Sequence, residues 1–181
     1  MNILTFSEAR AGLKAVMDDV CSDSSPTVIT RQSGEPVVML SLADFNSIEE
    51  TLYLLGSPKN ASRLLESFEQ LKAGKARIRE LHRSEKPKAS NKKQAGEAVV
   101  AFTDIGWEDY QHWQKVDPRL SEKIADLIDA CIADPFKGIG KPEPLKGNLS
   151  GLWSRRIDLQ HRLVYAVADD IIYVAACRYH Y

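Results

Sequence analysis

The feature that most constrains the fold of this 181-residue chain is a stretch near its middle that has no large apolar residue. Residues Ser84–Ala98 read SEKPKASNKKQAGEA and are rich in Lys, Ala, Ser and Gly. This composition is typical of a linker. It predicts two segments, residues 1–83 and 99–181, each near the lower size limit for burying a core alone, so we expect both to depend on partners.

The overall composition indicates a folded globular protein, with 44% hydrophobic and 27% charged residues. Its cysteines, Cys21, Cys131 and Cys177, are widely separated and lack metal-ligand spacing, which argues against disulfides and zinc. The opening MNILTFSEAR does not have the pattern of a signal peptide, and the longest apolar run, Ile171–Cys177, is too short to span a bilayer. We therefore expect a cytoplasmic protein with no membrane partner.

Basic residues concentrate in the last quarter of the chain, although the net charge of the whole is −1. From Lys137 to Tyr181 there are seven Lys or Arg and four Asp or Glu. This balance is compatible with a phosphate-bearing ligand. It is equally compatible with a solvated sheet face that carries scattered arginines, so the charge alone does not decide.

Residues 1–83 contain helix and strand patterns in alternation. We expect a helix capped by Ser7, and a hairpin formed by strands at Thr27–Arg31 and Pro36–Ser41, which a strand at Asn2–Phe6 could join. Two more helices follow. The first begins after Ser41, carries an apolar stripe and stops at Gly56; the second begins at Pro58 and stops at Gly74. The apolar stripe of the first comprises Leu42, Phe45, Ile48, Leu52 and Leu55.

This order of elements, and the segments SEARAGL, VITRQSGEPVVMLSL, ADFNSIEETLYLL and SPKNASRLLESFEQLKAGK within it, resembles the YefM/Phd antitoxin family. The resemblance implies an α+β domain that dimerises, binds operator DNA through its N-terminal part and neutralises a toxin with its C-terminal tail. By position, Arg10 and Arg31 match the DNA-contacting arginines of the family. An Arg fork can hold a phosphate or a guanine edge through two hydrogen bonds. The alternative for each is an ordinary surface arginine. In the tail we expect Ile78 and Leu81 to be the apolar anchors.

Residues 99–181 read as a strand at VVAFTD, two helices at Gly106–Lys115 and Pro118–Ala133, and a loop over residues 136–151. Three strand candidates follow, at Leu152–Asp158, His161–Ala168 and Ile171–Arg178, and Asp169-Asp170 joins the last two as a hairpin. Two helices followed by an antiparallel sheet make an α+β fold.

The segments GKPEPLKGNLSGLWSRRI, HRLVYAV and AACRYHY, with GWEDYQHWQKVDPR before them, resemble the YoeB toxins of the RelE superfamily. The resemblance implies a metal-independent and cofactor-independent enzyme that cleaves mRNA in the ribosomal A site. The residues that it carries over by position are Glu143, Arg156, Arg162, His180 and Tyr181, with Lys146 and Arg155 as accessory phosphate contacts. One departure is Gln160, where family members can carry an acid.

These residue types suit RNA cleavage by the 2′-hydroxyl of the RNA itself, which gives a 2′,3′-cyclic phosphate and a 5′-hydroxyl. We expect Glu143 to be the general base and His180 the general acid, while Arg156 and Arg162 stabilise the charge on the phosphorane. Tyr181 offers an aromatic face for base stacking. Simple strand pairing places Arg162 and His180 on opposite faces, so a bulge or bend in the C-terminal tail is also expected.

Each assignment has an ordinary alternative. Glu143 between two prolines is most often a solvated loop acid, and His180 a frayed surface residue. The tryptophans Trp107, Trp113 and Trp153 are expected to be core aromatics. Three functions remain open: a latent ribonuclease fused to its antitoxin, an inert fusion that acts only as a DNA-binding autorepressor, and a nonspecific RNA-binding domain. The last leaves Glu143 and His180 without a purpose.

Overall fold

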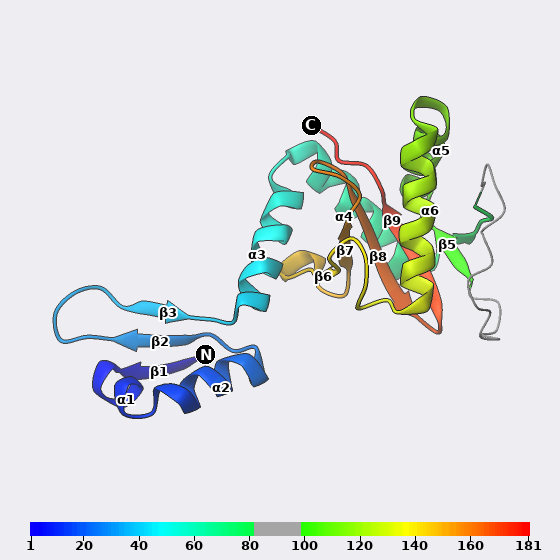
Figure 1. Ribbon diagram of the computed structural model, residues 1–181. Helices are drawn as coiled ribbons and strands as arrows, with labels where there is room; N and C mark the ends of the chain where they lie inside the picture. The colour runs from blue at the N-terminus through cyan, green and yellow to red at the C-terminus, as the bar shows by residue number, and fades with distance from the viewer. Residues whose placement is uncertain (82–98) are drawn as a thin grey trace. The chain divides into compact units, whose positions relative to one another are not determined.

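The computed structural model describes residues 1–81 and 99–181, and the expected linker Ser84–Ala98 lies outside them. The chain divides into two compact units, Met1–Glu49 and Glu50–Tyr181, which are coloured by residue number in Figure 1. The division between the units therefore falls within a helix, at residue 50, and residues 50–81 pack with the C-terminal unit. We call residues 50–81 the covering segment. The assignment of residues 1–83 to one functional half stays a proposal.

The N-terminal unit contains a three-stranded sheet of β1 (Asn2–Thr5), β2 (Thr27–Thr30) and β3 (Val37–Met39). Strand β1 runs parallel to β2, and β2 is antiparallel to β3, which confirms the expected hairpin and its third strand. Helices α1 (Phe6–Ala11) and α2 (Leu13–Asp23) connect β1 to β2.

The helix cap expected at Ser7 is wrong, because the cap of α1 is Thr5. The Thr5 hydroxyl accepts a hydrogen bond from the Glu8 backbone N–H at 3.3 Å, and the Glu8 carboxylate accepts one from the Thr5 N–H at 2.8 Å. Both halves of a capping box are therefore present, two residues earlier than Ser7.

Helix α3 (Leu42–Leu55) begins after Ser41, as expected, since the Ser41 hydroxyl accepts from the Asp44 N–H at 3.0 Å. Its buried side chains are polar except for Leu54. Asp44, Ser47, Glu50 and Thr51 are each 7% exposed or less, whereas Leu42, Phe45 and Leu52 of the apolar stripe are exposed. Helix α4 (Pro58–Lys72) starts at Pro58 with Ser57 as its cap, and Gly74 follows it at φ +66°.

The C-terminal unit is built on a six-stranded sheet in the order β4-β5-β9-β8-β7-β6. These strands comprise β4 (Arg77–Ile78), β5 (Val100–Phe102), β6 (Glu143–Pro144), β7 (Trp153–Arg156), β8 (Arg162–Ala168) and β9 (Ile171–Ala176). All neighbours are antiparallel except β5 and β9, which are parallel. Figure 1 shows β8 and β9 as the long central pair.

Helices α5 (Asp104–Val116) and α6 (Pro118–Ala133) contact each other, and both contact β9, so that the expected helix pair and α+β fold are confirmed. A short 3₁₀ turn, η1, spans Gly147–Leu149. The fourteen buried residues of the main core all come from residues 100–177, with Trp107 and Trp153 packed against them. Residues 99–181 thus carry a core of their own. None of the helices in residues 1–81 and 99–181 is long and apolar enough to cross a membrane.

Strands β8 and β9 contain a β-bulge, the kind of irregularity expected because simple strand pairing would place Arg162 and His180 on opposite faces. Asp169 and Asp170 both have positive φ, at 50° and 59°, and form the tight turn between β8 and β9. The pairing then shifts by one residue, from Tyr165 opposite Val174 to Val164 opposite Ala176. Ala175 is the extra residue of a β-bulge, which changes the side to which the following residues point.

Candidate active site

Arg162, at the start of β8, is 7% exposed and is held by a residue of the covering segment. Its Nε donates to the Glu50 carboxylate at 2.5 Å, and the same carboxylate oxygen accepts from the Ser154 hydroxyl of β7 at 2.7 Å. The guanidinium also lies 4.6 Å from the ring centre of Tyr53. Because the Arg162 guanidinium is buried and already binds the carboxylate of another segment, its position suits the binding of an anion.

Glu143 in β6 is half-buried and lies close to the same group of charges. Burial raises the pKa of the Glu143 carboxyl, Glu50 raises it further, and Lys141 and Arg156 act in the opposite direction. Strand β6 pairs Glu143 with Ser154, and β7 pairs Arg156 with Arg162. A carboxyl with a raised pKa is better matched to taking a proton near neutral pH. Glu143 and Arg162 thus both lie close to Glu50, and Arg156 lies close to Glu143.

His180 lies after β9 and is held from two sides. Its ring Nε2 is 3.0 Å from Asp109 Oδ1 on α5. Its backbone N–H donates to the Asn60 side-chain oxygen at 3.1 Å, and its carbonyl accepts from the Ser57 hydroxyl at 2.7 Å. The start of α4 therefore clamps the backbone of His180.

Side chains of the covering segment pack closely against Arg162 and Tyr179. Leu54, Asn60 and Leu64 line a gap together with Arg162 and Tyr179 that is too small for a water molecule. Asn60 connects two of the three predicted catalytic residues, since it lines this gap beside Arg162 and holds the His180 backbone. No space for a substrate remains at that point while the covering segment is in place.

The two remaining predicted contacts at this site have different degrees of exposure. Tyr181 is 71% exposed and packs edge-on against Tyr179, whose ring in turn stacks on Tyr53 at 5.1 Å. Lys146 is partly buried, and its backbone N–H donates to the Thr51 hydroxyl at 2.9 Å. Tyr181 therefore keeps a free aromatic face, while Lys146 lies under the end of α3.

Arg155 does not fit its predicted role as a phosphate contact. The residue is fully buried, and its guanidinium donates at 2.7 Å to the carbonyls of Ile139, Asp134 and Lys137 and at 3.2 Å to the Tyr165 hydroxyl. These contacts anchor the loop after α6 to the sheet. We therefore replace the phosphate contact with a structural role for Arg155.

This correction predicts that Arg155→Lys destabilises the C-terminal unit, because Lys cannot reproduce the fork that binds three carbonyls. Hydrogen bonds to charged groups contribute ~1.5–3 kcal/mol each, so we expect a loss of roughly 2–4 kcal/mol in the free energy of unfolding. Chemical denaturation measures it, with the exposed neighbour Arg156→Lys as the matched control. Equal stabilities of the two variants would contradict the structural role.

Helix α4 holds the covering segment on the sheet through apolar and polar contacts. Leu64 is buried with Leu54, and Phe68 and Leu71 pack on the same cluster. The buried Ser67 hydroxyl lies 2.5 Å from the Ala175 carbonyl at the bulge and 2.7 Å from the Thr103 hydroxyl.

The anchors expected further along the tail are only partly correct. Leu81 packs against the main core, but Ile78 is 68% exposed, since β4 pairs with β5 through its backbone. Most of the docking therefore lies earlier in the chain, in α3 and α4.

Several residues of this site were missed by sequence reasoning, namely Glu50, Ser57, Asn60, Arg63 and Asp109. The signal for Glu50 was present, because Asp44, Ser47, Thr51 and Leu54 recur at helical spacing beside it. These residues, polar except for Leu54, form the buried face of α3.

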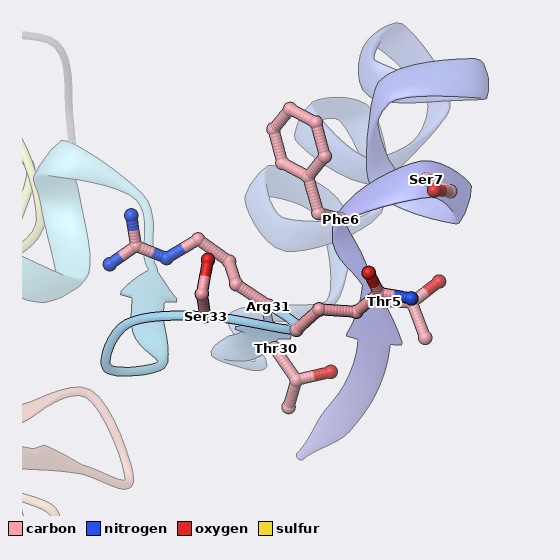
Figure 2. Close-up of a pocket in the computed structure, with 7 residues that line it drawn as sticks. Thr5, Phe6, Ser7, Thr30, Arg31 and Ser33 are labelled. Atoms are coloured by element: carbon pink, nitrogen blue, oxygen red, sulfur yellow. The ribbon is translucent and has the colours of Figure 1, made fainter.

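The predicted DNA contacts, Arg10 on α1 and Arg31 after β2, are both exposed and lie in the N-terminal unit. Arg31 lines a groove of about 680 Å³ with Thr5, Phe6 and Ser33, as Figure 2 shows. Its Nε and one terminal nitrogen donate to the Glu35 carbonyl at 3.1 and 2.7 Å. Gly34 at φ +98° lets the loop turn under the guanidinium, since a Cβ there would lie 3.3 Å from it.

Comparison with known proteins matches two separate parts of the chain to two families. Residues 102–181 match the model of the YoeB-like toxin of bacterial type II toxin-antitoxin systems, and residues 1–74 match that of the antitoxin Phd_YefM of type II toxin-antitoxin systems.

Individual relatives agree with these models. Toxin YoeB of Escherichia coli K12 is 58% identical over 82 residues, which are 45% of this chain and 98% of that protein. Antitoxin YefM of the same organism is 51% identical over 75 residues, 41% of this chain and 90% of that protein. A solved heterotetrameric complex of YoeB-YefM from Staphylococcus aureus has a chain that is 44% identical, with a TM-score of 0.44 over 45% of this chain and 95% of that one.

Proposed function

Because the chain belongs to the YoeB toxin family through its C-terminal part and to the Phd/YefM antitoxin family through its N-terminal part, we propose that it joins a ribonuclease to its own inhibitor. The toxin part, residues 99–181, cleaves mRNA in the ribosomal A site and so inhibits translation. The antitoxin part, residues 1–83, neutralises it and binds operator DNA as an autorepressor. Because its proposed partners are ribosome-bound mRNA and operator DNA, we propose that the protein acts in the cytoplasm.

The proposed reaction is attack of the RNA 2′-hydroxyl on the adjacent phosphate. Glu143 takes the 2′-hydroxyl proton as the new O–P bond forms, and His180 protonates the 5′-oxygen as its bond to phosphorus breaks. Arg162 and Arg156 stabilise the negative charge of the phosphorane, and Lys146 assists them at its edge. Tyr181 stacks on an exposed base. The products are a 2′,3′-cyclic phosphate and a 5′-hydroxyl.

The observation that carries this proposal is the position of the Glu50 carboxylate. It lies 2.5 Å from Arg162 Nε and 2.7 Å from the Ser154 hydroxyl, next to Glu143. During the reaction, the substrate phosphate would be an anion bound to the buried Arg162, next to a carboxyl of raised pKa. Glu50 thus stands where a substrate phosphate would bind, and this supports both the identity of the site and its inhibition.

The same contacts support latency of the toxin in the intact chain. The covering segment holds Arg162 through Glu50 and the His180 backbone through Ser57 and Asn60. One segment thus occupies the Arg162 guanidinium and fixes the backbone of His180, two of the three predicted catalytic residues, and RNA would have to displace Glu50 to reach Arg162. Activity therefore requires removal of the covering segment.

Self-association through the antitoxin part is supported by the exposed apolar stripe of α3, in which Leu42 is 74% and Phe45 48% exposed. Exposed apolar residues repeated along one helix mark an interaction surface. A homodimer would pair two copies of the N-terminal unit and present two sets of Arg10 and Arg31 to operator DNA.

For operator binding we predict that Arg10→Ala or Arg31→Ala weakens affinity by about 1–3 kcal/mol, the cost of losing a bidentate base contact. Fluorescence anisotropy with the operator at fixed salt measures it, since phosphate contacts depend on salt. Lys59→Ala removes an exposed charge outside the N-terminal unit and is the control. Unchanged affinity in both Arg variants would remove them from the DNA interface.

The experiment that tests the proposed function is a translation reaction with mapping of mRNA 5′ ends, in which the intact chain is compared with residues 99–181. We expect cleavage at codons in the A site with residues 99–181 and none with the intact chain. The alternative function is a catalytically inert fusion that acts only as an autorepressor, favoured by the exposed Arg10 and Arg31. Absence of cleavage by residues 99–181 would favour that alternative.

A further inference from the structure

Asp109 is a buried acid that the proposed reaction does not use. It lies on α5, its side chain is 1% exposed, and Oδ1 is 3.0 Å from His180 Nε2. Its second oxygen accepts a hydrogen bond from the Cys177 backbone N–H at 3.2 Å. Asp109 therefore connects α5 to the end of β9 and to the ring of His180.

We propose that Asp109 is the positioning residue of the general acid: it fixes His180 with the proton on Nε2, so that Nδ1 is the nitrogen that passes a proton to the leaving group. An ionised carboxylate accepts hydrogen bonds and cannot donate them, so Nε2 facing Asp109 must carry a proton. This inference rests on the proposed function, because it assigns one step of that reaction to one nitrogen.

With the proton of neutral His180 fixed on Nε2, each proton in the transfer to the leaving group can be assigned. The cationic ring carries protons on Nε2 and Nδ1, and the Nδ1 proton goes to the 5′-oxygen, which receives the electron pair of the breaking P–O bond. The ring is left neutral with the Nε2 proton still shared with Asp109. The carboxylate thus stabilises the cationic ring before transfer and holds its orientation after it.

Other charged groups surround this pair. Arg63 of α4 donates to the same Asp109 oxygen at 3.1 Å, and Arg178 on the tail lies near His112 and His161. His112 on α5 and His161 before β8 also face the pair, and burial is the first cause that lowers the pKa of both imidazoles. Both are therefore mainly neutral at pH 7. Asp109 is the negative group that contacts the His180 ring directly.

Arg63 belongs to the covering segment, so the inhibitor and the general acid share one carboxylate oxygen. Its Nε is buried without a hydrogen-bond partner among the described residues. The test must therefore remove the Arg63 charge to isolate the effect of Asp109 on His180.

Substitution of Asp109 by Asn has a specific consequence for His180. The Cys177 N–H is always a donor, so the Asn carbonyl must face it, and the Asn amide N–H₂ must then face His180. His180 Nε2 must become an acceptor, which moves the ring proton to Nδ1. A residue that only supports α5 would have no effect on the tautomer.

The test is ¹⁵N NMR of the His180 ring in the intact chain, at a pH where the ring is neutral. We expect a proton on Nε2 in the wild type and in Arg63→Met, and on Nδ1 in Arg63→Met/Asp109→Asn. A wild-type ring with its proton on Nδ1 would overturn the inference without any variant. Retention of the Nε2 proton in the double variant would do the same.

Cleavage by residues 99–181, which carry their own core, gives the second measurement. We expect Asp109→Asn to lower the rate by on the order of 100-fold or more, because general acid catalysis contributes 10²–10⁴-fold. A wild-type rate in this variant would overturn the positioning role. If the wild-type segment itself does not cleave, the proposed function fails, while the NMR result still decides whether Asp109 sets the tautomer.

Discussion

Replacing His180 by Ala or Glu143 by Gln in residues 99–181 is expected to lower ribosome-dependent mRNA cleavage by about 10²–10⁴-fold, the usual contribution of a general acid or base. Neither side chain is part of the main core, so the fold should remain. The raised pKa of Glu143 sets the direction of the pH dependence. Cleavage should fall at low pH as this carboxyl becomes protonated, and Glu143→Gln should lack that loss.

The measurement is the single-turnover rate on programmed ribosomes between pH 5 and 8, with circular dichroism as the check on folding. Glu108→Gln is the matched control, because Glu108 is an exposed acid on α5 next to Asp109. Rates equal to wild type in either active-site variant would remove that residue from the acid–base pair. Loss of activity in the Glu108 variant would indicate a general effect of charge instead.

Replacing Glu50 by Ala is expected to weaken the inhibition more than any other single change in the covering segment. The Glu50–Arg162 pair is buried, with both side chains 7% exposed, and removal of one partner leaves an uncompensated charge. Breaking such a pair costs about 3–5 kcal/mol, which is roughly a 150- to 4,000-fold loss of affinity.

Calorimetric titration of residues 1–81 into residues 99–181 measures this loss directly. Glu49→Ala is the matched control, since Glu49 precedes Glu50 in the same helix and is exposed. The intact chain with Glu50→Ala should also show cleavage that the wild-type chain lacks. Equal affinities of the two variants would show that Glu50 does not hold the covering segment on the site.

Much of the fold follows from short-range signals in the sequence. Helix α6 spans Pro118–Ala133 as predicted, because Pro at the first turn and Asp134-Pro135 at the end define it locally. Asp169-Asp170 forms the predicted turn, since both residues tolerate positive φ. The bulge at Ala175 could be inferred from the conflict between strand pairing and the expected roles of Arg162 and His180.

The buried face of α3 could not be predicted from apolar periodicity. Leu42, Phe45 and Leu52 of the regular stripe are exposed, yet the polar residues Asp44, Ser47 and Glu50 are among the buried side chains. A periodicity argument assumes that the apolar side of a helix faces the core. Glu50 instead meets the buried cation Arg162, and the repeat of polar residues beside Glu50 marks a face of α3 without identifying a charged partner distant in the sequence.

Arg155 and Arg156 illustrate the same limit within the site. They are adjacent arginines in β7, but Arg155 is fully buried against carbonyls whereas Arg156 is exposed. The two residues are of the same type. Their roles differ because the loop after α6 packs on only one side of β7, the side to which Arg155 points. Asp109 was missed because its partners, His180 and Cys177, lie about 70 residues away.

The most direct test of the account is to place a protease site within residues 84–98 and to follow mRNA cleavage after the chain is cut there. The covering segment holds the site by its own contacts, so the cut chain should stay inactive, and cleavage should begin only when residues 1–81 are degraded. Immediate activity on cutting, or full activity in the uncut chain, would contradict the claim that the covering segment is the inhibitor.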